Sequence, residues 1–169
     1  MVSWAFMPLI STIMSSRVIS VTPRLPLCAL IRLLADENIG GAPVVDETGR
    51  PVGIVSKSDL IFDDYDVICT CDRTEVSSTG KGRVHWQKVA GSRVSEHGEL
   101  FDGRNFATST VADVMTSNPL VVLPTATISE TSELMVKRRI HRVPVVDENA
   151  QLVGMVTTFD ITRWVARGA

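Results

Sequence analysis

Residues 41–60 read GAPVVDETGRPVGIVSKSDL, and residues 142–161 read RVPVVDENAQLVGMVTTFDI. The two stretches align without a gap, and each position in the second lies 101 residues after its counterpart in the first. The same register extends back to Met14 and Met115. An ungapped register of this length is the signature of an internal repeat. The sequence therefore predicts a chain built from two copies of one unit.

Each copy contains the pattern of a β-hairpin that leads into a helix. Two β-branched apolar runs flank an acidic turn, within 44–55 in the first copy and 145–156 in the second. Gly49 can supply the positive φ that the first turn needs, and in the second turn Asn149 is a better candidate than Ala150. After each hairpin comes the S/T-x-x-D spacing of a helix capping box.

The residues before each hairpin complete the unit. Residues 18–21 are predicted to form a first strand, and Pro26 can occupy the first turn of the helix that follows. In the second copy, Thr127 and Glu130 have the spacing of a capping box for the equivalent helix. The repeat is thus strand, helix, strand, strand, helix. The apolar face of the first of these helices has helical spacing and consists of Leu27, Leu30, Ile31 and Leu34.

Together these motifs resemble the CBS domain pair, or Bateman module. The resemblance rests on the two Pro-Val-Val-Asp strands, on the Gly-x-Val-Ser/Thr-x-x-Asp segments that end at Asp59 and Asp160, and on the Val-Met-Thr and Ile-Met-Ser openings. It covers residues 9–62 and 110–167. It implies an α+β fold in which two CBS repeats, 9–62 and 111–167, pack sheet to sheet about a pseudo-twofold axis and form one globular module.

Composition and charge limit the possible partners. A chain of 169 residues with 44% hydrophobic residues can bury a sizeable core. The formal net charge of -2 and the pI of about 5.9 argue against a general nucleic-acid or anionic-membrane binder. Three cysteines are too few for a secreted disulfide framework, which favours a reducing, cytoplasmic location. No segment reaches the roughly 18 apolar residues that a membrane span requires.

Two stretches lie outside the repeat pattern. The N-terminal arm, residues 1–12, carries Trp4 and Phe6 and should be covered by the second repeat or by a second subunit. This arm and the helix that contains Trp164 predict a homodimer. The insertion, residues 63–110, is polar and is interpreted as a solvated linker rather than a metal or redox site. Its ligand-capable residues do not have zinc-knuckle spacing: Cys69, Cys71, His85 and His97.

The four residues of the two S/T-x-x-D segments have two interpretations. Helix capping alone accounts for their spacing. A helix N-terminus also attracts phosphate, and a carboxylate there can accept two hydrogen bonds from a ribose 2′,3′-diol. In families that resemble this chain, the hydroxyl contacts phosphate and the Asp holds the ribose of an adenosine nucleotide. The residues concerned are Ser56, Asp59, Thr157 and Asp160.

A basic run precedes the Val-Pro-Val strand of the second copy. It could simply complement a helix C-terminus. His141 and Arg142 at its end resemble the pair that contacts nucleotide phosphates in kinase-regulating CBS proteins, whereas the first copy has Gly40 and Gly41 there. The two sites should therefore not be equivalent. With the strand prolines, the resemblance predicts nucleotide-binding residues at Thr157, Asp160, His141, Arg142, Pro144, Ser56, Asp59 and Pro43.

No catalytic constellation is present in the sequence: the three histidines are far apart, and there is no nucleophile elbow, P-loop or H-E-x-x-H helix. The sequence predicts a regulatory module without enzyme activity, required cofactor or metal. It would sense AMP, ADP, ATP or S-adenosylmethionine and act on a separate, unidentified protein. The alternative is a ligand-independent oligomerisation or protein-interaction module with the same fold.

Overall fold

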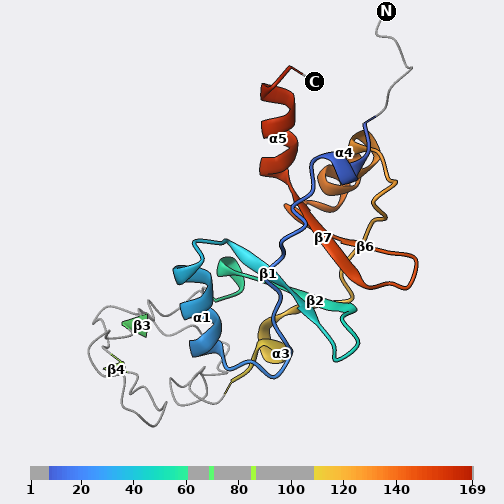
Figure 1. Ribbon diagram of the computed structural model, residues 1–169. Helices are drawn as coiled ribbons and strands as arrows, with labels where there is room; N and C mark the ends of the chain where they lie inside the picture. The colour runs from blue at the N-terminus through green and yellow to red at the C-terminus, as the bar shows by residue number, and fades with distance from the viewer. Residues whose placement is uncertain (1–7, 61–68, 71–84, 87–108, 169) are drawn as a thin grey trace, which may run out of the picture. The chain divides into compact units, whose positions relative to one another are not determined.

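The computed structural model describes residues 8–60, 69–70, 85–86 and 109–168 (Figure 1). The chain divides into two compact units. One contains residues 1–23, 42–54 and 116–169, and the other contains residues 24–41 and 55–115. The units do not coincide with the sequence repeats, because the first hairpin groups with the second repeat.

The second repeat is regular and carries most of the candidate site. It consists of α4 (Ile128–Arg138), β6 (Arg142–Val146), β7 (Leu152–Thr157) and α5 (Thr158–Ala166). The predicted capping box begins α4, where the Thr127 hydroxyl accepts a hydrogen bond from the Glu130 N–H. Helix α4 ends at Arg138, because the next residue, Arg139, has a left-handed conformation that terminates the helical hydrogen bonding. Helix α5 follows β7 directly (Figure 1).

The β6–β7 hairpin has one face against the helices. Its antiparallel register pairs Val143 with Val156 and Pro144 with Met155. Because side chains alternate along a strand, Val143, Val145 and Val156 share a face. That face forms the core together with Ile10, Ile128 and Met135, and Ile161 and Trp164 of α5 pack against this core. The opposite face of the hairpin carries Arg142, Pro144, Met155 and Thr157.

Each hairpin turn contains one residue with positive φ, and this residue differs between the two repeats. Gly49 has the predicted positive φ of 81°. In the second turn, however, the positive φ of 62° belongs to Ala150 and the preference for Asn149 was wrong. The reason lies in the aspartate before each turn, since Asp147 Oδ1 accepts hydrogen bonds from the backbone N–H groups of Asn149 and Gln151. These bonds hold Asn149 at a turn position with negative φ, and the left-handed conformation is adopted by the next residue, Ala150.

The N-terminal segment belongs to the second repeat. The short 3₁₀ helix η1 (Ile10–Thr12) places Ile10 in the core of that repeat, where it is fully buried. The Ile10 N–H donates to the Ala126 carbonyl at 2.8 Å, and Ser15 forms a backbone bridge with Met155. Gly154 permits this approach, because a Cβ there would lie 2.7 Å from the Met14 sulfur. Of the two covers predicted for the arm, the second repeat is the one that buries Ile10, while Trp4 and Phe6 lie outside the described residues.

In the first repeat, α1 (Leu27–Asp36) buries Leu27, Leu30 and Leu34, three of the four residues of its predicted apolar face. Pro26 caps α1 instead of occupying its first turn. Strands β1 (Gly41–Val45) and β2 (Pro51–Ser56) form the hairpin, and the 3₁₀ helix η2 (Lys57–Leu60) follows. A four-residue helix, α3 (Val111–Val114), leads to β5 (Thr116–Ser117), which extends the sheet in the order β1-β2-β5.

The predicted strand at 18–21 does not form. Its only ladder contact in the described part of the chain is a parallel bridge between Val21 and Val44, matched by one between Val122 and Val145 in the second repeat. The reason is geometric: the chain crosses β1 at one residue, where Val21 donates to the Pro43 carbonyl and accepts from the Val45 N–H. One such exchange does not make a strand.

Within the insertion, the structure describes one short pairing. Strand β3 (Cys69–Thr70) pairs antiparallel with β4 (His85–Trp86), so that Cys69 lies opposite Trp86. Cys71 and His97 lie outside the described residues. Among the residues that are described, no cluster of three potential metal ligands occurs. None of the helices in the described ranges has the length and apolar character needed to cross a bilayer.

Candidate functional site

The predicted capping box at the start of α5 holds a buried carboxylate in a fixed position. Asp160 Oδ2 accepts hydrogen bonds from the Thr157 N–H at 2.9 Å and from the Thr157 hydroxyl at 2.6 Å. In return, the Thr157 hydroxyl accepts from the Asp160 N–H at 3.2 Å. The Asp160 side chain is only 8% exposed. The capping interpretation of this pair is therefore confirmed, and it leaves Oδ1 as the oxygen that Thr157 does not use.

A residue that the sequence analysis did not select contacts this second oxygen. Arg163 donates from Nη2 to Asp160 Oδ1 at 3.0 Å, across one helical turn. The Arg163 guanidinium also lies over the Phe159 ring, 5.1 Å from its centroid. The signal was available in the sequence, because Asp and Arg three positions apart on a helix face each other.

Two other predicted residues share the sheet face of Thr157. Arg142 pairs with Thr157 in the β6–β7 register, so their side chains leave the same face of the hairpin. Pro144 lies two residues along on that face and is buried. The backbone fixes this arrangement at its end, where the Thr158 N–H donates to the His141 carbonyl at 3.0 Å. The structure thus brings together Arg142, Pro144, Thr157 and the carboxylate of Asp160.

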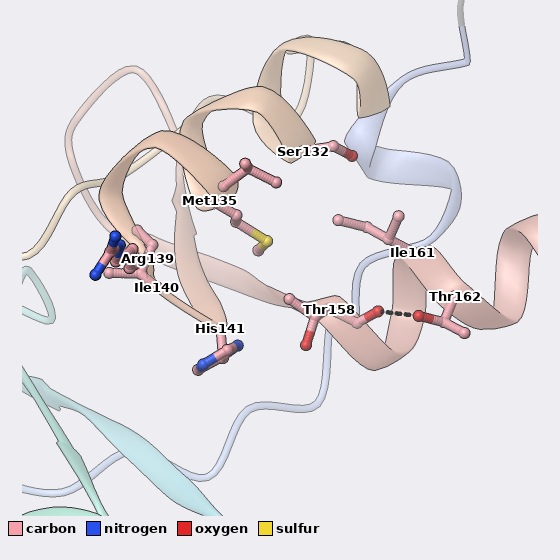
Figure 2. Close-up of a pocket in the computed structure, with 9 residues that line it drawn as sticks. Ser132, Met135, Arg139, Ile140, His141, Thr158, Ile161 and Thr162 are labelled. Atoms are coloured by element: carbon pink, nitrogen blue, oxygen red, sulfur yellow. Dashed lines mark hydrogen bonds between the residues drawn. The ribbon is translucent and has the colours of Figure 1, made fainter.

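His141 is placed differently. Its side chain lines a cavity of about 430 Å³ between α4 and α5, on the helix side of the hairpin (Figure 2). His141 precedes β6, whereas Arg142 is the first residue of that strand and its register places it opposite Thr157. The residues that line the cavity are Ser132, Met135, Val136, Arg139, Ile140, His141, Thr158, Ile161 and Thr162.

The walls of this α4/α5 cavity are mostly apolar. Figure 2 shows Met135 and Ile161 projecting into it from the two helices. Two of its hydroxyls are already used, since Ser132 donates to the Ile128 carbonyl at 2.6 Å and Thr162 to the Thr158 carbonyl at 2.8 Å. The cavity therefore offers an apolar surface with few polar groups available to a ligand.

In the first repeat, Ser56 and Asp59 form the carboxylate half of the same arrangement, at the start of the short 3₁₀ helix η2. Asp59 Oδ2 accepts from the Ser56 N–H at 2.7 Å and from the Ser56 hydroxyl at 2.8 Å. Pro43 is buried in β1, as Pro144 is in β6. In the alignment of the two repeats, Gly40 and Gly41 occupy the positions of His141 and Arg142. The first repeat therefore has no basic side chain at these two positions.

Caps of the same design occur away from the candidate site. A hydrogen bond from the Thr127 hydroxyl, followed by one from its N–H, lowers the pKa of Glu130. At α3, the Thr110 N–H and then its hydroxyl lower the pKa of Asp113. Both carboxylates stabilise a helix start outside the β6–β7 face. A Thr-x-x-acid motif is therefore not sufficient to identify a ligand site in this chain.

Comparison with known proteins identifies the family. The model of the CBS domain matches residues 10–64 and 111–167, and this chain belongs to that family. A relative, an uncharacterized protein of Methanocaldococcus jannaschii, is 34% identical over 135 residues, which cover 80% of this chain and 78% of that protein. The tandem CBS fold predicted from the sequence is confirmed.

Two solved CBS structures share this fold at low sequence identity. The CBS domain pair of protein MJ0100, in complex with 5′-methylthioadenosine and S-adenosyl-L-methionine, has a TM-score of 0.66 at 22% identity, covering 97% of this chain and 100% of that one. CBSX2 in complex with AMP has a TM-score of 0.65 at 22% identity, covering 94% of this chain and 96% of that one. At this level of identity the similarity establishes the fold alone.

Proposed function

We propose that this chain is a non-catalytic regulatory module that binds an adenosine nucleotide and acts on a separate protein. The observation that carries the proposal is the position of Arg142 opposite Thr157, the residue whose N–H holds the carboxylate of Asp160. A buried carboxylate can accept hydrogen bonds from a ribose, and a neighbouring guanidinium can bind phosphate. The adenosine ligands bound by the structurally similar MJ0100 and CBSX2 support the same class of ligand.

The charges of the site favour one kind of adenosine ligand. Arg142 lies opposite Thr157, at the start of a nine-residue helix whose N-terminus also attracts anions. Both features favour 5′-phosphates over the positively charged sulfonium of S-adenosylmethionine. We therefore propose AMP, ADP or ATP as the ligand, with the second repeat as the stronger site because the first has glycines at 40 and 41.

Isothermal titration calorimetry with AMP, ADP, ATP and S-adenosylmethionine tests this proposal on the full chain. We expect at least one phosphorylated nucleotide to bind more tightly than S-adenosylmethionine. Thermal melting in the same ligands provides an independent readout, because a ligand that binds only the folded state raises the melting temperature. Absence of both heat and a melting shift with all four ligands at millimolar concentration would reject the proposed function.

The apolar α4/α5 face favours assembly as a second candidate function. Val136 is 78% exposed at the edge of the cavity, and Val165, which is 58% exposed, lies one turn after Ile161 on α5. Projecting valines beside an apolar cavity form a surface that can complement a second copy of itself about a twofold axis. We therefore propose a homodimer through this face. Trp164, by contrast, packs against the core.

Sedimentation velocity of Val136→Glu tests the homodimer. We expect the wild-type chain to sediment as a dimer at micromolar concentration and the variant to shift toward the 18.4 kDa monomer, because burying an unpaired carboxylate is costly. Val121→Glu is the matched control, since Val121 is also exposed but lies outside α4 and α5. A monomeric wild type, or a dimer that survives Val136→Glu, would contradict this interface. A stable dimer without nucleotide binding would favour the assembly function over the sensor.

A further inference from the structure

Both oxygens of Asp160 already have partners within the chain. Thr157 supplies two donors to Oδ2, and Arg163 supplies one to Oδ1 at 3.0 Å. A ribose 2′,3′-diol binds a carboxylate best when each hydroxyl donates to a carboxylate oxygen. The Thr157 bonds also form the cap of α5 and cannot be given up without loosening the helix start. Oδ1 is thus the oxygen at which a ribose has to compete.

We propose that Arg163 is a built-in competitor of the ribose at Asp160, so that ligand binding requires its guanidinium to leave Oδ1. This inference rests on the proposed function, because it concerns the same nucleotide site. Arg163 would set both the affinity of the site and its preference for ligands with an intact diol. A ligand that does not use Oδ1 would bind without displacing Arg163.

The surroundings of Arg163 lower the free-energy cost of moving its guanidinium away from Asp160. Its side chain is 48% exposed, whereas that of Asp160 is 8% exposed. The guanidinium can therefore return to water, while the carboxylate needs a replacement donor that the ribose hydroxyls can supply. The Phe159 ring, 68% exposed, offers the guanidinium a contact that does not depend on Asp160.

The first repeat has no counterpart to this competition in its sequence. The 101-residue register places Phe62 at the position of Arg163, while Asp59 and Ser56 retain the cap. The guanidinium is therefore not part of the repeated unit, and the cap does not require a cation three residues on. This contrast favours a role for Arg163 that is specific to the second site.

Adenosine and 2′,3′-dideoxyadenosine are the ligands that isolate the competition. Neither carries a phosphate whose attraction to Arg163 would obscure it, and the second lacks both hydroxyls of the diol. We compare the wild-type chain with Arg163→Met, which keeps the length of the side chain and removes its donors. We expect Arg163→Met to bind adenosine roughly 2- to 5-fold more tightly, the range of a partly exposed ion pair. Its affinity for 2′,3′-dideoxyadenosine should equal that of the wild type.

Two variants complete the experiment. Arg163→Lys keeps a cation within reach of Asp160 and should restore the wild-type preference. Arg167→Met removes a cation from the end of the same helix, about 10 Å along the axis from Asp160, and should leave both affinities unchanged. A merely structural role for Arg163 predicts a lower melting temperature for Arg163→Met with no change in the adenosine preference.

The results separate the inference from the proposed function. If the wild type binds adenosine and Arg163→Met binds it equally or more weakly, Arg163 is not a competitor and the inference is overturned, while nucleotide sensing stands. Equal gains for adenosine and 2′,3′-dideoxyadenosine also overturn it, because the effect would not act through the ribose hydroxyls. If neither protein binds adenosine or AMP at millimolar concentration, the proposed function fails and the inference fails with it.

Discussion

Asp160→Ala is expected to weaken AMP binding by about 10- to 150-fold, or roughly 1.5 to 3 kcal/mol, which is the range for hydrogen bonds to a charged group. The buried carboxylate is fixed by Thr157 in the position where a ribose would be bound. The same substitution removes a helix cap and should lower the free energy of unfolding by about 1 kcal/mol. A binding isotherm measured by calorimetry, with folding checked by circular dichroism, separates the two effects.

Glu130→Ala is the matched control for the cap. Glu130 occupies the equivalent position in the capping box of α4, away from the proposed nucleotide site at the start of α5. Its loss should affect stability similarly and leave AMP affinity unchanged. Asp59→Ala should weaken binding less than Asp160→Ala, because the first repeat has glycines in place of His141 and Arg142. Equal AMP affinities for the wild type, Asp160→Ala and Glu130→Ala would show that Asp160 is a cap and nothing more.

Ile10→Ala should lower the free energy of unfolding by about 2 to 5 kcal/mol, although it lies outside both hairpins. Ile10 is fully buried among Ile128, Met135 and the inward valines of β6 and β7. Its truncation leaves a cavity in a core where the surrounding side chains come from rigid elements. Urea unfolding followed by circular dichroism measures the change.

Leu9→Ala is the neighbouring control. Leu9 is 38% exposed and precedes η1, so its truncation should cost less than half as much as that of Ile10. If Ile10→Ala unfolds at the wild-type urea concentration, the N-terminal segment does not contribute to the core of the second repeat. Equal losses for both variants would point to a general effect of the segment rather than to burial of one side chain.

The sequence was sufficient for the parts of the fold that depend on local pattern. The repeat register, the hairpins and the capping boxes at Thr127 and Thr157 follow from spacing and turn chemistry, and the structure confirms them. The need to cover the apolar residue Ile10 was also predicted, and the structure shows that the second repeat, one of the two predicted alternatives, covers it.

The errors arose at contacts that residue preference and motif spacing do not take into account. Asp147 fixes Asn149 and transfers the positive φ to Ala150, which residue preference alone does not reveal. Residues 18–21 have strand propensity, but β1 is crossed at Val21 only. The Arg163 contact was missed because the capping motif was considered without the next turn of the helix.

The docking of Ile10 and Ser15 onto the second repeat also determines the order in which the molecule can be assembled during synthesis. The carbonyls that receive their N–H groups belong to Ala126 and Met155, near the other end of the chain. Residues 8–15 are synthesised before the second repeat, so the N–H groups of Ile10 and Ser15 cannot bond to Ala126 and Met155 until that repeat has been made. Closing so long a loop carries an entropic cost before these contacts form. The core of the second repeat is therefore completed by a segment that was synthesised earlier.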